Sequence, residues 1–157
     1  MKKLIVIALA VVLALSALVV LAACDSEKTY DGEYSYAHPY APDSGAKYGA
    51  KVHVTVKGGV IMGVTVDADT ADFFNLTDSW TEEGKANWNS HKAEFLKSFE
   101  GMTVAELKAI KVECNEKGVP NEKGISGMPK DWNYVAGCTQ SSGRIILAMQ
   151  NALKDVA

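Results

Sequence analysis

One stretch near the C-terminus combines residue types that hold anions in other proteins. Residues 137–144 read Gly-Cys-Thr-Gln-Ser-Ser-Gly-Arg. They lead into apolar positions at helical spacing, namely Ile145, Met149, Ala152 and Val156, flanked by Ile146, Ala148 and Leu153. A helix start presents free N–H groups and the positive end of the helix dipole, a combination that suits phosphate. The stretch therefore predicts a phosphate-binding helix start.

Individual residues in this stretch have specific expected roles. Ser141 or Ser142 is expected to be the N-cap, because a serine hydroxyl accepts a backbone N–H of the first turn. Gly137 allows the backbone to approach another group closely. The positive charge of Arg144 in the first turn is unfavourable beside the positive end of the helix dipole, unless an anion offsets it. The alternative is a well-capped surface helix with a solvent-exposed arginine.

The same stretch resembles the C-terminal motif of the FMN-binding domain family, which includes small extracytoplasmic flavoproteins and the flavinylated subunit of sodium-pumping respiratory complexes. That family typically reads Ser-Gly-Ala-Thr and then, one residue later, Thr-Ser; residues 136–142 here read Ala-Gly-Cys-Thr-Gln-Ser-Ser. The resemblance implies that FMN is the cofactor. The cofactor-binding residues that it implies are Gly137, Cys138, Thr139, Gln140, Ser141, Ser142 and Arg144.

The resemblance also bears on how FMN is held. In many family members a separate flavin transferase attaches FMN to the motif threonine through a phosphoester, and Thr139 occupies that position. Two positions differ from the family pattern. Asn133 stands where an aspartate usually helps the transferase recognise its target, and Cys138 replaces alanine. Covalent and non-covalent FMN both stay open.

The N-terminus carries an export signal. Lys2 and Lys3 precede an apolar segment, residues 4–23, in which Ser16 is the one polar residue, and this pattern is typical of a signal peptide. Residues 21–24, Leu-Ala-Ala-Cys, resemble a bacterial lipobox, which implies lipidation at Cys24. The alternative is an uncleaved signal anchor, because the segment is just long enough to span a bilayer. Either anchor predicts a location at the cell membrane, facing outside the cytoplasm.

Length and charge restrict the number of domains and the partners of the remaining chain. The chain has 157 residues, so removal of the first 23 leaves 134, about the size of one domain. The formal net charge of −3 becomes −5 once the two leader lysines are gone. An acidic domain without a basic run predicts no nucleic-acid partner. The predicted divisions are a signal peptide at 1–23, a lipidated tether at 24–30 and an FMN-binding domain at 31–157.

The predicted fold class is α+β, with a small antiparallel sheet, helices packed on one of its faces, and the lipoprotein signal helix in front. Strands are expected at 31–37 and in a hairpin over 52–66 that turns at Gly58-Gly59. The expected inward-facing residues of that hairpin are Val52, Val54, Val56, Val60, Met62, Val64 and Val66. Helices are expected at 90–99 and, from the capping box at Thr103, at 103–110.

Two segments, 67–89 and 112–137, are expected to be irregular. Asn-Glu-Lys-Gly occurs twice in the second segment, at 115–118 and 121–124, and each copy is expected to form a turn. A long loop inside a compact domain is often functional. Met128 and Trp132 are therefore candidates for a flavin-facing wall, or else they simply pack the loop against the core.

Other chemistry is weakly supported. His38, His53 and His91 lie on different predicted elements without ligand spacing, so no metal site and no catalytic residue are predicted. Besides Cys24, the thiols are Cys114 and Cys138, which either pair in an oxidising compartment or stay free. Two free thiols are favoured.

These observations favour a membrane-anchored extracytoplasmic FMN-binding electron carrier, which passes electrons from a membrane donor to an exported acceptor. Its expected partners are the membrane, a flavin transferase and redox partner proteins, and the protein is a carrier rather than a catalyst. The alternative is a cofactor-free envelope lipoprotein that binds a ligand or a partner. A reductase with its own substrate site is a weaker third hypothesis, because no dedicated substrate site is evident.

Overall fold

The computed structural model describes residues 26–38, 42–67, 73–74, 81–128 and 139–157. The predicted signal segment, Cys24, Trp132 and Asn133 lie outside these residues. In chain order the elements are β1 (Lys28–Ala37), the 3-10 turn η1 (Pro42–Ser44), β2 (Lys47–Lys57), β3 (Val60–Val66), β4 (Phe73–Phe74), α2 (Glu82–Lys97), α3 (Val104–Ala109), β5 (Lys111–Cys114), β6 (Pro120–Ser126) and α4 (Thr139–Ala152). The α+β class is confirmed. No helix among the described residues combines the length and the apolar character that crossing a membrane requires.

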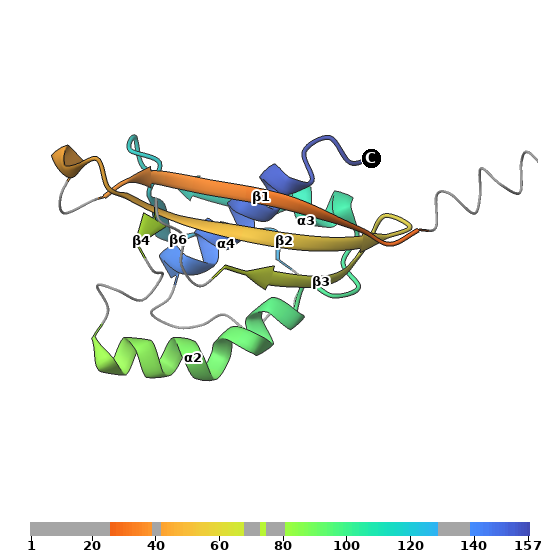
Figure 1. Ribbon diagram of the computed structural model, residues 1–157, viewed down its shortest axis with the longest axis horizontal. Helices are drawn as coiled ribbons and strands as arrows, with labels where there is room; N and C mark the ends of the chain where they lie inside the picture. The colour runs from red at the N-terminus through yellow and green to blue at the C-terminus, as the bar shows by residue number, and fades with distance from the viewer. Residues whose placement is uncertain (1–25, 39–41, 68–72, 75–80, 129–138) are drawn as a thin grey trace, which may run out of the picture.

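The main sheet is a meander of β1, β2 and β3, with β2 in the middle (Figure 1). Both pairings are antiparallel, and the short β4 pairs in parallel with the start of β2. Alternation along β2 places Ala50, Val52, Val54 and Val56 in the core, whereas Lys51, His53 and Thr55 are partly exposed. Core residues of α2 and α4 pack on the apolar face. Helices therefore cover one face, as predicted, and the other face is polar.

The predicted β2–β3 hairpin is present, with a register that the alternation did not show. Gly58 and Gly59 both have positive φ, 56° and 77°, as a two-residue hairpin turn requires. Pairing then steps from Thr55↔Gly63 to Val56↔Ile61, so Met62 is the extra residue of a β-bulge. Ile61 is fully buried and Met62 is 48% exposed. The predicted inward positions of Val60 and Met62 are wrong, because the bulge shifts the alternation, so that Ile61 lies in the core and Val60 pairs with the exposed Lys57.

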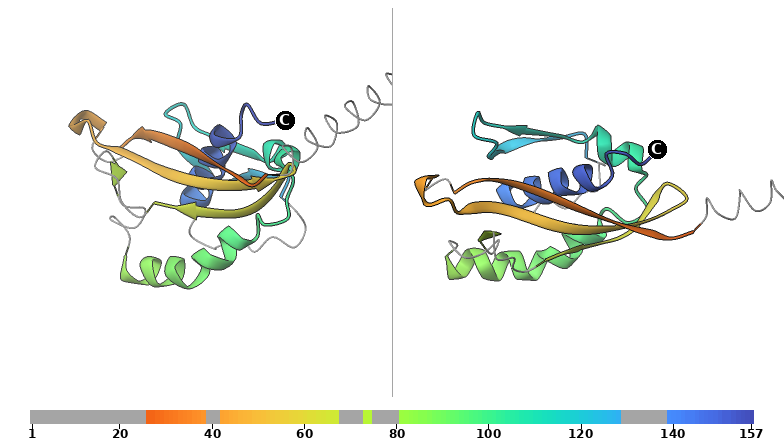
Figure 2. Two further views of the ribbon diagram at one scale, coloured as in Figure 1. Left: turned by 45° about the vertical axis from the view of Figure 1, so that its right-hand side comes forward. Right: turned by 45° about the horizontal axis from the view of Figure 1, so that its top comes forward.

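Helix α4 lies between two β layers. Figure 2 shows it with the main sheet on one side and the β5–β6 hairpin on the other. Glycines permit close contact on both sides: a Cβ on Gly32 would lie 2.1 Å from the Ala148 carbonyl oxygen, and one on Gly143 would lie 2.7 Å from Pro120 Cβ. All of the predicted apolar positions of α4 are buried or pack against the core. The surface-helix alternative is therefore wrong.

Three boundaries differ from the sequence-based expectation. Strand β1 starts at Lys28, so residues 28–30 of the predicted tether belong to the sheet. Helix α2 starts at Glu82, where the Thr81 hydroxyl accepts a hydrogen bond from the Gly84 N–H at 3.1 Å. Its first half was predicted as irregular because Trp88 is its one core residue there. The capping box at Thr103 is present and starts α3.

The predicted loop over 112–137 contains a β-hairpin. Strands β5 and β6 pair antiparallel with an irregular register. The first Asn-Glu-Lys-Gly copy is a turn, closed by a 2.9 Å hydrogen bond from the Gly118 N–H to the Asn115 carbonyl. The second copy lies within β6, so its prediction as a turn is wrong. Polar strand residues gave no apolar alternation from which the hairpin was recognisable.

Candidate functional site

The site predicted from the sequence lies at the start of α4. The helix begins at Thr139, so Ser141 and Ser142 lie in its first turn and the prediction that one of them is the N-cap is wrong. Both serine side chains are buried, at 1% and 0% exposure. Gly137 and Cys138 lie outside the described residues. Of Thr139 and Gln140 the structure describes the helical backbone, which places Thr139 at the helix N-terminus.

Arg144 is the most unusual residue of this helix start. Its side chain is 2% exposed, and its Nη2 donates a 2.8 Å hydrogen bond to the Ser141 Oγ. Its Cζ lies 5.2 Å from the centroid of the Tyr48 ring. Burial lowers the pKa of Arg144, and the interactions with Tyr36 and Tyr48 act in the opposite direction. Because arginine keeps its proton in proteins, a positive charge is held in the interior.

Burying this charge has a cost in solvation. Moving an ion out of water costs several kcal/mol even after the protein relaxes. Among the described residues, the guanidinium contacts include the Ser141 hydroxyl and the Tyr48 ring, which are neutral groups. The dipole of α4 adds positive potential at the same end. An anion bound at this turn would offset both the burial cost and the dipole potential. It would also accept hydrogen bonds from the free N–H groups of the helix start.

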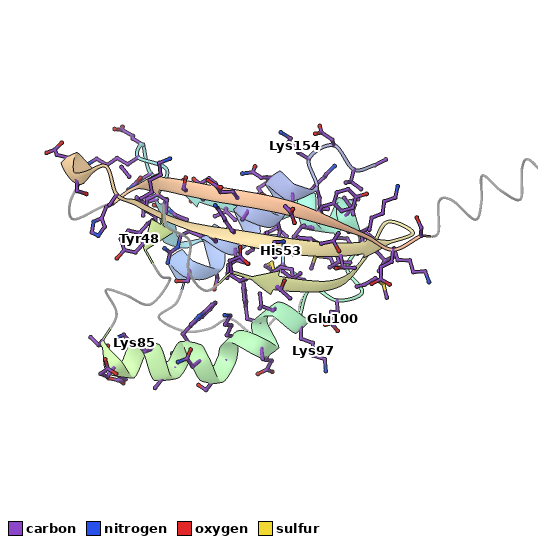
Figure 3. The ribbon with its side chains drawn as sticks, in the orientation of Figure 1. Tyr48, His53, Lys85, Lys97, Glu100 and Lys154 are labelled. Atoms are coloured by element: carbon purple, nitrogen blue, oxygen red, sulfur yellow. The ribbon has the colours of Figure 1, made fainter. Side chains whose placement is uncertain are left out.

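Aromatic side chains border the guanidinium. We call Tyr34, Tyr36, His38 and Tyr48 the aromatic cluster. The Tyr36 and Tyr48 rings are nearly parallel, with an interplanar angle of 13° and centroids 6.3 Å apart. His38 lies 4.7 Å from the Tyr48 ring, and Tyr34 lies 6.4 Å from the Tyr36 ring. Figure 3 shows Tyr48 toward the end of the sheet where α4 begins.

The aromatic cluster was not predicted from the sequence. A usable signal was present, because Tyr30, Tyr34 and Tyr36 occupy alternate positions of one strand and therefore share a face of the sheet. Contact between this strand and α4 depends on Gly32, whose missing side chain leaves room for Ala148 and Ala152. Nothing in the spacing of the tyrosines points to a helix more than one hundred residues away.

The β5–β6 hairpin is joined to the aromatic cluster by Tyr34. The Tyr34 hydroxyl donates a 2.7 Å hydrogen bond to the Gly118 carbonyl and lies 3.7 Å from Cys114 Sγ. Burial, reinforced by Cys114, raises the pKa of Tyr34 to about 12. Cys114 has a free thiol. Met128 packs against the core, which favours its alternative role as a packing residue.

A separate polar cluster lies on the other face of the sheet. His53 Nδ1 is 2.6 Å from Asp31 Oδ1, and His53 Nε2 is 3.0 Å from Asp67 Oδ1. The hydrogen bonds to Asp31 and then to Asp67 raise the pKa of His53. Among the described residues, no group of three or more His, Cys, Asp or Glu side chains is arranged to hold a metal ion. The His53 cluster links three strands of the sheet.

Comparisons with known proteins add no family assignment. No protein-family model matches the chain, and neither the curated proteins nor the solved structures contain a match.

Proposed function

We propose that this protein is a membrane-anchored, extracytoplasmic FMN-binding electron carrier, which takes electrons from a membrane donor and passes them to an exported acceptor. The observation that carries the proposal is the buried Arg144 guanidinium at the start of α4, bonded to Ser141. A phosphate monoester matches this cationic helix start. The resemblance of residues 136–142 to the FMN-binding motif supports FMN as the source of that phosphate.

The residues of the chain then have distinct tasks. Ser141, Ser142, Arg144 and the first backbone N–H groups of α4 hold the phosphate. Tyr36 and Tyr48 are 6% and 5% exposed, so they exclude water and strengthen electrostatic contacts at the guanidinium. FMN supplies the chemistry of one- and two-electron transfer, and the protein contributes binding and orientation.

A comparison of two flavins tests the phosphate site. The full-length protein, purified in detergent without flavin, is titrated with FMN and with riboflavin, and binding is followed by quenching of flavin fluorescence. A hydrogen bond to a charged group contributes about 1.5–3 kcal/mol, so riboflavin should bind at least about tenfold more weakly. Equal affinities would contradict a phosphate site. Absence of binding by both flavins would favour the cofactor-free lipoprotein.

Covalent attachment through Thr139 is the second part of the proposal. A threonine hydroxyl is a weak nucleophile without a base, so a flavin transferase is the expected catalyst. A base of the transferase takes the proton of the Thr139 hydroxyl, the Thr139 oxygen forms a bond to the FMN phosphorus of FAD, the bond between the two phosphates breaks, and AMP leaves. Thr139 starts α4, so the resulting phosphodiester would lie at the positive end of the helix.

Mass spectrometry of denatured protein distinguishes the two modes of holding FMN. After co-expression with a flavin transferase, the wild-type polypeptide should gain the mass of FMN less one water. Thr139→Ala should not gain this mass. An unchanged wild-type mass with flavin released on denaturation would show that the cofactor is held without a covalent bond.

Anchoring through Cys24 is the third part. The motif at residues 21–24 predicts that residues 1–23 are removed and that Cys24 becomes the lipidated N-terminus. The mature protein should then have the mass of residues 24–157 plus acyl chains, and it should partition with membranes. Cys24→Ala should abolish acylation. A mature protein that retains residues 1–23 would contradict lipidation and favour the uncleaved signal anchor.

A further inference from the structure

The start of β1 fixes how far the folded domain extends from its proposed anchor. Strand β1 begins at Lys28, so residues 25–27 are the whole connection between Cys24 and the sheet. Four Cα-to-Cα steps reach at most about 14 Å when the chain is extended. An uncleaved apolar segment that ends at residue 23 allows five steps, or at most about 18 Å. The end of the sheet that carries Lys28 therefore stays close to the bilayer surface.

Two strands and a turn form this end of the domain. Lys28 pairs with Val56, so the start of β1 lies beside the end of β2 and the β2–β3 turn. Figure 1 shows these segments together at one end of the sheet, with η1 and β4 at the other. Lys28, Lys57 and Glu27 are exposed there. The start of α3, which carries the exposed Glu106, joins the β2–β3 turn through the Val104 N–H and the Gly59 carbonyl. The short tether, rather than a basic patch, therefore keeps this end at the bilayer.

The candidate cofactor site lies at the opposite end of the same strands. Tyr36 of β1 pairs with Tyr48 of β2, and Arg144 contacts the Tyr48 ring. Tyr36 follows Lys28 by eight residues, which corresponds to about 27 Å along an antiparallel strand. The site is thus separated from the anchored end by nearly the full length of the sheet.

We propose that the domain stands on the membrane on its Lys28–Lys57 end and holds the start of α4 roughly 27 Å farther out. This inference rests on the proposed anchoring and, for its redox consequence, on the proposed FMN site. The exchange partners of the flavin are then water-soluble proteins or the extramembranous domains of membrane proteins, rather than quinones dissolved in the bilayer. Charge does not favour lying flat on the outer sheet face, because Lys47, Lys51 and His53 balance Asp31, Glu33 and Asp67 there.

Strand β2 offers a matched pair of positions for a test. Lys47 and Lys57 are its first and last residues, and both are exposed. Lys57→Cys and Lys47→Cys are made separately in full-length protein with Cys114→Ser and Cys138→Ser, and each is labelled with the same fluorophore. The protein is reconstituted into vesicles that contain anionic lipid and a quencher attached to lipid headgroups.

The expected result is quenching at residue 57 that is several-fold stronger than at residue 47. Equal quenching, stronger quenching at residue 47, or no quenching at either position would overturn the proposed orientation. Flavin is absent from this measurement, so its outcome is independent of whether the protein binds FMN.

A lengthened tether tests the cause of the orientation. About twenty Gly/Ser residues inserted after residue 25 give the tether a typical reach of roughly 25 Å. The quenching ratio between the two positions should then fall toward one. An unchanged ratio would overturn the inference that the short tether sets the orientation.

Discussion

Two polar clusters lie on opposite faces of the same sheet. The outer cluster consists of Asp31, His53 and Asp67, and the inner cluster of Ser141, Arg144 and Tyr48. In the outer cluster an imidazole lies between two carboxylates and its side chain is 42% exposed. In the inner cluster a guanidinium with 2% exposure contacts a hydroxyl and an aromatic ring. The two cations therefore differ in their access to solvent: the outer one is open to water, and the inner one lies in the interior.

The difference between the clusters indicates where a ligand belongs. In the outer cluster each imidazole nitrogen has a carboxylate partner and the cluster is open to solvent, so its geometry points to no further ligand. The inner cluster places a cation where the helix dipole is also positive and where ions are costly to bury. An anionic ligand would offset that cost, and this is why we propose a ligand site at the start of α4 rather than on the polar face of the sheet.

The largest effect is expected in the apolar part of α4. Met149 is fully buried in the same helix as Arg144. Met149→Ala should lower the free energy of unfolding by about 2–5 kcal/mol, because it removes apolar contacts and leaves a cavity. Arg144→Met should lower it by about 1–3 kcal/mol without flavin, because it leaves the buried Ser141 hydroxyl without its 2.8 Å hydrogen bond. Urea unfolding of both variants measures these changes in the free energy of unfolding. Comparable losses would indicate that Arg144 acts mainly in stability.

The next effect concerns the contact that brings α4 onto the aromatic cluster. Gly32→Ala should destabilise the protein by about 1–3 kcal/mol, because overpacking forces the backbone apart, and a Cβ there would meet the Ala148 carbonyl oxygen at 2.1 Å. Gly63→Ala is the matched control, since a Cβ on Gly63 has no atom within 4 Å. In thermal unfolding, Gly32→Ala should have a clearly lower unfolding temperature than Gly63→Ala. Equal unfolding temperatures would contradict close packing of β1 on α4.

The smallest effect belongs to the outer cluster. The raised pKa of His53 means that its stabilising contribution is fully present below about pH 6.5 and is lost as pH rises through the folded-state pKa. Because the pair is exposed, the contribution should stay below about 1 kcal/mol. His53→Gln should therefore be less stable than wild type at pH 5.5 and equal to it at pH 9. A difference that does not vary with pH would show that the carboxylates do not act through the histidine charge.

Local patterns predicted much of the fold. The valine alternation in β2, the Gly58-Gly59 turn and the capping box at Thr103 each depend on neighbouring residues, and all three are present. The bulge at Met62 was missed because it is a property of strand pairing, which alternation within one strand does not encode. The β5–β6 hairpin was missed because its residues are polar and it is stabilised by packing on α4.

Only those residues of the candidate site that are neighbours in sequence could be predicted. Ser141, Ser142 and Arg144 were identified because they are adjacent in sequence. Their burial was not foreseen, since it results from α4 lying between two β layers. Tyr36 and Tyr48 join the site through strand pairing and through Gly32, both of which are long-range features. A local motif therefore located the helix start, and the three-dimensional packing supplied the aromatic neighbours.

The central claim is that the inner cluster binds the phosphate of FMN through Arg144. FMN and riboflavin are titrated into full-length wild type and into Arg144→Met, with unfolding curves confirming that both are folded. The account predicts that wild type prefers FMN by at least about tenfold, because a charge-assisted hydrogen bond is lost with riboflavin. It also predicts that Arg144→Met loses this preference while it keeps the riboflavin affinity of wild type. An undiminished preference for FMN in Arg144→Met would contradict the account.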